Sequence, residues 1–298
     1  MKSRTRVENV IKGLPTDRVP FGELTVDPLF CQKMLGSDVF TFSLAKEFWE
    51  MLGLDLIVFQ PGYQEETLRD ALEGISRWRE KTDFYVFAII GGGFSKALDI
   101  LGFSRFMHDI VKDPAGMKEI IGKLAIEELE TGRRCIEAGA QAVMIGDDIA
   151  YQSGTYLSPE QMRQLSFPVL QEQVERLKEQ AVPVFFHSDG NLNAVLDDLL
   201  VMGFDGLQGL EAGAGMDIAA VKEKTRDRIT LMGNIDLSHL HPEAEEEEIR
   251  DVVKKTFNSA KKGGRYIFGT SGGLHKNLPV EKVKTMYSAA RQFARYEQ

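Results

Sequence analysis

The 298-residue chain is 43% hydrophobic and 27% charged, the composition of an ordinary soluble globular protein. Its net charge of −9 and pI of about 5.2 argue against nucleic acid as a partner. No apolar run approaches the ~20 residues that a membrane span needs. The amphipathic start MKSRTRVENVIKGL lacks the apolar core of a signal peptide, so we expect a cytoplasmic protein.

Short apolar runs rich in β-formers alternate along the chain with longer amphipathic runs. Near-continuous apolar runs of this length are typical of strands that are buried on both faces of a parallel sheet. We expect eight strands, at residues 18–24, 54–60, 84–90, 142–147, 182–187, 206–211, 229–234 and 266–270.

Helical patterns separate many of these runs. The clearest cover residues 114–138, 158–180, 191–202, 242–262 and 279–296. Eight strands alternating with helices predict an α/β fold, a single (β/α)8 TIM barrel over residues 1–298 with an N-terminal helical extension. A doubly wound sheet is the alternative, but no glycine-rich nucleotide-binding motif is present. The two cysteines, Cys31 and Cys135, lie in apolar helical stretches and are expected to be reduced.

Polar residues follow the expected strands directly, at the ends where such barrels place their chemistry. The most specific patch is VFFHSDGN, in which His187 and Asp189 come after a buried strand. Glu211 ends the next strand, so we expect these three side chains to point into one cavity. They could hold a metal ion. They could equally form a general acid–base group without a metal.

Other strand ends supply further candidates. Of Asp147 and Asp148, one would face the barrel mouth and the other would cap a loop. The glycines at 91–93 would let a ligand approach the backbone, or make a tight turn. Candidates for substrate orientation or proton delivery are Glu23, Asp147, Asp148, Tyr151, Asn191, Asn234, Asp236 and Ser271. Phe94, Phe103, Phe106 and Met107 would wall an aromatic pocket or pack in helix cores.

The motifs IEAGAQAVMIGDDIA, LSPEQMRQLSFPVLQ, VPVFFHSDGN, MGFDGLQGLE and GNID together resemble the uroporphyrinogen decarboxylase superfamily over nearly the whole chain. The resemblance implies a (β/α)8 barrel and two main chemistries. One is porphyrinogen decarboxylation. The other is methyl transfer with a cobalamin (corrinoid) carried by a partner protein.

The decarboxylase branch matches less well. Its members carry an Arg-Gln-Ala-Gly-Arg type segment after the first strand, which binds propionate groups. Residues 22–27 read GELTVD here, with no arginine. A substrate with eight carboxylates would lack partners in this acidic mouth.

The methyltransferase branch matches better. Its thiol-methylating members hold zinc through His-x-Cys after strand five, an acidic residue after strand six and a cysteine at strand eight. His187 and Glu211 match two of these positions, whereas Asp189 replaces a cysteine and residues 270–272 contain none. The resemblance therefore implies a zinc held by His187, Asp189 and Glu211, or no metal. Oxygen and nitrogen ligands leave a harder metal that suits an ether oxygen.

The resemblance implies an O-demethylase component of anaerobic one-carbon metabolism. It would move a methyl group from a small methylated donor, such as a methoxylated aromatic, to the Co(I) corrinoid of a partner protein. His187, Asp189, Glu211 and Asp147 would be catalytic. The alternatives are a lyase for a substrate smaller than a porphyrinogen, methyl transfer from methyl-corrinoid to tetrahydrofolate, and ligand binding without turnover. The family suggests a homodimer.

Overall fold

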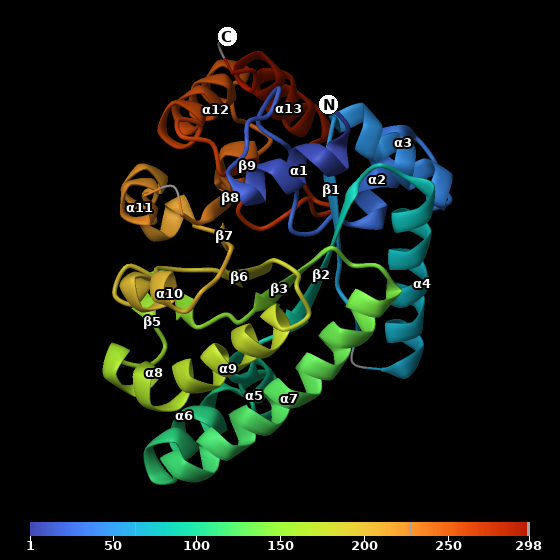
Figure 1. Ribbon diagram of the computed structural model, residues 1–298. Helices are drawn as coiled ribbons and strands as arrows, with labels where there is room; N and C mark the ends of the chain where they lie inside the picture. The colour runs from blue at the N-terminus through green and yellow to red at the C-terminus, as the bar shows by residue number, and fades with distance from the viewer. Residues whose placement is uncertain (63, 227, 297–298) are drawn as a thin grey trace. The chain divides into compact units, whose positions relative to one another are not determined.

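The computed structural model describes residues 1–62, 64–226 and 228–296 (Figure 1). Its parallel sheet has the strand order β1-β2-β3-β6-β7-β8-β9, which is the order along the chain. These strands are β1 Leu56–Phe59, β2 Tyr85–Gly91, β3 Ala142–Gly146, β6 Val184–Ser188, β7 Gly206–Gly209, β8 Thr230–Ile235 and β9 Tyr266–Thr270. A separate antiparallel hairpin joins β4 Ala150–Tyr151 to β5 Gly154–Thr155. The α/β class and seven of the eight predicted strands are confirmed.

The α-helices precede, separate and follow these strands. They are α1 Ser3–Lys12, α2 Pro28–Leu35, α3 Phe42–Leu52, α4 Glu65–Lys81, α5 Gly93–Leu101, α6 Phe103–Lys112, α7 Pro114–Ala138, α8 Pro159–Leu165, α9 Phe167–Lys178, α10 Leu196–Val201, α11 Ile218–Thr225, α12 Glu246–Ala260 and α13 Val280–Phe293. Two short 3₁₀ turns, η1 Ala212–Ala214 and η2 Leu237–Leu240, follow β7 and β8. Helix α1 precedes the strand segment at 18–24 and forms the expected N-terminal extension, whereas α2 and α3 lie between that segment and β1. None of the described helices is long and apolar enough to cross a membrane.

The chain divides into two compact units. The first comprises residues 1–58, 83–85 and 208–298, and the second comprises residues 59–82 and 86–207. The single domain expected over residues 1–298 stays a prediction.

In the first unit, the expected strand at 18–24 forms isolated bridges rather than a continuous ladder. Phe21 bridges to Phe268 of β9. On its other side, the Phe21 carbonyl accepts a 2.7 Å hydrogen bond from the Asp55 amide just before β1. The segment thus lies between β9 and β1, the place of the first barrel strand. Pro20 has no N–H to donate, which shortens the ladder.

Several helix boundaries differ from the expected ones. The pattern at 158–180 predicted one helix, but α8 ends at Leu165 and α9 begins at Phe167. Pro168 removes an amide donor, so the first helix cannot continue through it. The expected helix at 191–202 is only α10, because Asn191 turns the chain by accepting the Asn193 amide at 3.0 Å.

Both cysteines are buried free thiols, as expected. Cys31 lies in α2 and Cys135 in α7. Burial raises the pKa of each thiol to about 12, so neither is a reactive thiolate at neutral pH. They act as small core residues.

One buried carboxylate joins the N-terminal segment to the start of β1 within the first unit. Asp55 is fully buried and accepts hydrogen bonds from Arg6 Nη1 at 2.6 Å and Arg18 Nη1 at 2.8 Å. It also accepts the Phe21 amide at 2.8 Å. Asp55 precedes β1, so this network lies at the amino end of the strand and serves stability rather than chemistry.

Candidate active site at the carboxyl ends of β3 and β6

The pairing of β3 with β6, in the second unit, continues beyond the last residues of both strands. Gly146 is the register partner of His187. Past that point, the Asp147 amide donates to the His187 carbonyl at 2.9 Å. The Asp189 amide donates to Asp148 Oδ1, also at 2.9 Å. The two loops are therefore held together residue by residue, which fixes their side chains relative to one another.

This pairing gathers Asp148, His187 and Asp189 into one cluster. One ligand atom from each lies within 4.8 Å of the others. His187 Nε2 lies 3.6 Å from Asp148 Oδ1, with the imidazole buried and the carboxylate half-exposed. The structure thus brings His187 and Asp189 together, and it adds Asp148, which the sequence suggested for substrate. Imidazole and carboxylate donors at this spacing suit a divalent cation such as zinc.

Asp147 is not part of that cluster and instead holds the start of α5. Its buried carboxylate accepts the Ser95 amide at 2.7 Å. Burial, together with the nearby charge of Asp148, raises the pKa of Asp147 to about 7. A Cβ on Gly92 would lie 2.0 Å from Asp147 Cγ. The glycine turn therefore makes room for this carboxylate, and it is Asp148 that faces His187.

A buried ion pair that sequence reasoning missed supports the same turn. Lys96 of α5 pairs with Glu128 of α7, and both are buried. Glu128 Oε2 also accepts the Gly91 amide at 2.8 Å, while Gln173 of α9 donates to the Gly91 carbonyl at 3.3 Å. The sequence did carry a signal, since Glu128 occupies a core position in the apolar periodicity of α7.

The phenylalanines after β2 divide into core and surface residues. Phe94 and Phe106 are fully buried and pack edge to face, with centroids 4.8 Å apart. The core-packing interpretation is therefore correct for these two. Phe103 is 56% exposed and contacts Tyr156, a residue that the sequence reasoning did not single out. Met107 is only partly exposed.

Four further candidates lie in the first unit and make hydrogen bonds within it. Glu211 is partly exposed at the N-cap of η1. Buried Asn234 donates to the Leu210 carbonyl at 2.8 Å, and Asp236 accepts the Gly213 amide at 2.8 Å. The carbonyl of buried Ser271 accepts from the Gln208 amide group at 3.0 Å. Their catalytic or binding roles stay predictions, as does the place of Glu211 in a metal site.

Glu23 is the most thoroughly bound of the predicted substrate residues. Its buried carboxylate accepts the Thr270 amide at 3.2 Å and also the hydroxyls of Thr270 and Tyr287. Burial raises the pKa of Glu23 to about 7 despite these donors. Glu23 therefore ties the first strand segment to the end of β9 and to α13.

We expect Glu23 to make the protein less stable as the pH rises from 5 to 8. Because the folded-state pKa lies above the ordinary 4.5, folding favours the protonated acid. Its stabilising contribution is complete below about pH 4.5 and is lost as the pH rises through about 7. The free energy of unfolding, measured with denaturant, should fall less between pH 5 and 8 for Glu23→Gln than for the wild type. The exposed Glu247→Gln is the control, and equal slopes in wild type and Glu23→Gln would contradict the assignment.

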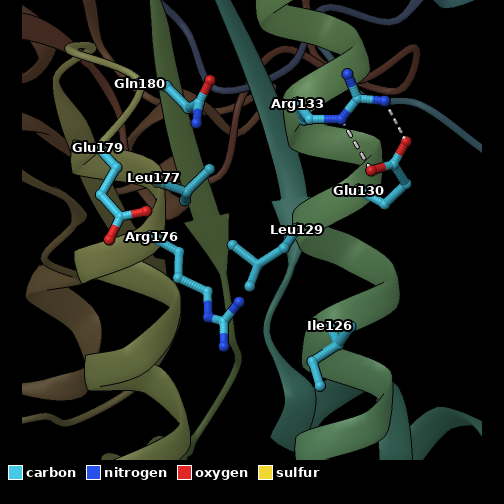
Figure 2. Close-up of a pocket in the computed structure, with 8 residues that line it drawn as sticks. All are labelled: Ile126, Leu129, Glu130, Arg133, Arg176, Leu177, Glu179 and Gln180. Carbon is cyan, nitrogen blue, oxygen red and sulfur yellow. Dashed lines mark hydrogen bonds and ion pairs between the residues drawn. The ribbon is translucent and has the colours of Figure 1, made fainter.

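A concavity in the second unit, between α7 and α9, lacks the metal-binding side chains of the cluster (Figure 2). It is lined by Ile126, Leu129, Glu130, Arg133, Arg176, Leu177, Glu179 and Gln180. Arg133 pairs with Glu130 on its own helix at 2.6 Å, and Arg176 pairs with Glu172 at 2.6 Å. These charges are satisfied within their helices, so the groove is a surface feature between packed helices.

Comparison with known proteins agrees with the fold. A methyltransferase from Methanosarcina mazei has a similar structure, with a TM-score of 0.81 and 21% sequence identity over 98% of this chain and 99% of that one. This likeness shows that the fold is the expected TIM barrel type. The family described as uroporphyrinogen decarboxylase (URO-D) matches residues 54–293. The chain therefore belongs to the URO-D family, as the sequence motifs indicated.

Curated relatives include proteins of both chemistries. A uroporphyrinogen decarboxylase of Pseudoalteromonas atlantica is 29% identical over 69% of this chain and 55% of its own length. A methylcobamide:CoM methyltransferase of Methanosarcina barkeri is 26% identical over 77% of this chain and 65% of its own length. The chain thus spans little more than half the length of the decarboxylase.

Proposed function

We propose that the protein is a methyltransferase that moves a methyl group from a small methylated donor to the Co(I) corrinoid of a partner protein. A methoxylated aromatic is the proposed donor. The observation that carries the proposal is the cluster of Asp148, His187 and Asp189 at the carboxyl ends of β3 and β6. The methyltransferase relatives support it.

The donor set of the cluster fits a zinc ion. One imidazole nitrogen and two carboxylate oxygens lie within 4.8 Å of one another, and both carboxylates are exposed, which leaves room for a further ligand. A metal bound here would supply Lewis-acid polarisation of the donor oxygen. Glu211 is the proposed additional ligand, as the family pattern implies.

The protein's own groups can assist the departing oxygen. In the proposed transfer, the bond between the methyl carbon and the ether oxygen breaks, and the carbon bonds to the corrinoid cobalt. The electron pair of the broken bond stays on the oxygen, which then takes up a proton. Where no metal occupies the cluster, the pair of His187 and Asp148, whose Nε2 and Oδ1 atoms lie 3.6 Å apart, would instead deliver that proton. The Asp189 amide fixes the Asp148 carboxylate in place.

The other strand-end residues would orient the donor. We assign this role to Glu23, Tyr151, Asn191, Asn234, Asp236 and Ser271, and we assign Asp147 to the support of the loop that carries Asp148. The side-chain hydrogen bonds of Asn234 and Asp236 described above would keep these groups in fixed orientations. A homodimer is proposed on the family resemblance alone.

Decarboxylation is the second candidate, because the URO-D family includes uroporphyrinogen decarboxylases among the relatives. It would act on a substrate smaller than a porphyrinogen, since the segment at 22–27 has no arginine. Methyl transfer from methyl-corrinoid to tetrahydrofolate would use the same cluster in the opposite sense.

One pair of assays separates these functions. Purified protein is mixed with chemically reduced cob(I)alamin and 2-methoxyphenol, and the conversion to methylcobalamin is followed by absorbance. We expect conversion that depends on the protein and scales with its concentration. Carbon dioxide release from uroporphyrinogen or smaller carboxylated pyrroles, without cobalamin, would instead establish the decarboxylase. No methyl transfer to cobalamin from any of a panel of oxygen- and nitrogen-methyl donors would overturn the proposal.

A further inference from the structure

The β4–β5 hairpin was not expected from the sequence, and it is attached to the loop that carries His187 and Asp189. The Asn191 amide donates to the Tyr151 carbonyl at 2.9 Å. Gly190 has φ +84°, and a Cβ there would lie 2.6 Å from the Tyr151 amide nitrogen. Only glycine allows the two backbones to pack this closely. The hairpin therefore has a fixed position next to the cluster.

Aromatic rings connect this hairpin to the core of the second unit. Tyr156 stacks with Phe94, with centroids 6.4 Å apart and an interplanar angle of 20°. It also stacks with Tyr151 of β4, at 5.5 Å and 29°. Phe103 meets Tyr156 at 6.0 Å with its ring tilted by 64°. The rings are thus held by packing from Phe94 outward.

Burial decreases along the same series. Phe94 is fully buried, Tyr156 is partly exposed, and Tyr151 is 49% exposed. Within the described part of the chain, neither the Tyr151 nor the Tyr156 hydroxyl has a hydrogen-bond partner. A half-exposed ring that is braced from the core offers apolar area and a free hydroxyl at little entropic cost.

We propose that Tyr151 and Tyr156 form the surface that selects an aromatic donor, with the donor ring stacked on Tyr151 and contacting Phe103 at the edge. This inference rests on the proposed function and names the part of the site that recognises the donor's ring. The hairpin carries Tyr151 three residues after Asp148, so a ring stacked there would place a substituent toward the cluster. Aliphatic methyl ethers lack the flat face that such stacking needs.

Ligand binding tests the inference without any methyl transfer. Calorimetric titration of the purified protein with 2-methoxyphenol is compared with titration by 2-methoxycyclohexanol, which has similar size and polarity but no aromatic face. We expect Tyr151→Leu and Tyr156→Leu to weaken the binding of 2-methoxyphenol by about tenfold, the size of one stacking contact. Tyr151→Phe should retain most of the affinity for methoxybenzene, because the ring remains.

The control is Phe40→Leu, which removes a 43% exposed ring of the first unit. Circular dichroism confirms that each variant is folded. Equal affinity for 2-methoxyphenol in the wild type and both leucine variants would overturn the inference, as would no binding by the wild type. A defect limited to association with a corrinoid protein would also overturn it, since the rings would then contact the partner.

Kinetics separate this inference from the proposed function. In the cob(I)alamin assay, Tyr151→Leu should raise KM for 2-methoxyphenol about tenfold with little change in kcat. If the wild type binds 2-methoxyphenol through Tyr151 but transfers no methyl group, the proposed function fails and the aromatic surface stands. If the wild type transfers the methyl group and the leucine variants behave as wild type, the proposed function stands and the aromatic surface is wrong.

Discussion

His187→Ala is expected to lose bound metal and to lower the rate of methyl transfer by at least about 100-fold, since even outer-shell changes at metal sites cost 10- to 100-fold. The imidazole is the buried member of the cluster, so its removal takes away the ligand that is best shielded from water. The measurement is metal content by mass spectrometry on protein purified with zinc present, together with the cob(I)alamin assay.

The third ligand can be identified in the same experiment. Asp148→Asn and Asp189→Asn are compared with Glu211→Gln. Loss of metal in Asp148→Asn, with metal retained in Glu211→Gln, would assign the ion to the cluster of Asp148, His187 and Asp189. The reverse pattern would assign it to the family's positions. His108→Ala is the control, because that ring is 65% exposed and pairs with its neighbour Asp109.

Two results would change the interpretation. Full metal content in His187→Ala would mean that other residues hold the ion. A wild-type protein without metal, but with activity that His187→Ala abolishes, would favour proton delivery by the His187–Asp148 pair.

Lys96→Met is expected to lower the free energy of unfolding by about 3–5 kcal/mol, the usual cost of breaking a buried ion pair. The methionine leaves the Glu128 carboxylate buried without its cation, although the Gly91 amide still donates to it. Denaturant unfolding measures the change. Glu128 accepts the Gly91 amide in the glycine turn that packs against Asp147. Because Asp147 precedes Asp148 of the cluster, we also expect a lower rate of methyl transfer.

A double variant, Lys96→Met combined with Glu128→Gln, tests whether the unpaired charge causes the loss of stability. The glutamine keeps an acceptor for the Gly91 amide but carries no charge, so most of the lost stability should return. Lys123→Met is the surface control, since Lys123 and Glu119 are both 69% exposed and such pairs contribute less than about 1 kcal/mol. A loss below about 1 kcal/mol in Lys96→Met would show that the pair does not stabilise the fold.

Local sequence patterns were sufficient to predict most of the strands and the longest helix. The apolar runs predicted β3, β6 and β9 to within two residues, because a strand buried on both faces must be apolar almost throughout. The helix at α7 was predicted with both ends, since Pro114 starts it and Gly139, with φ 115°, stops it. The prediction of one helix over 158–180 was wrong because the apolar periodicity continues across the break at Ser166.

The sequence by itself determined the family, the strand order and the neighbourhood of His187 and Asp189, because these depend on spacing along one strand end. Only the tertiary structure decided that Asp148, not Asp147, faces His187, and that Lys96 and Glu128 meet beneath the glycine turn. It also decided that Tyr151 and Tyr156 stack on the core. The physical reason is that side-chain direction and contacts between distant segments depend on packing, which short-range patterns do not encode.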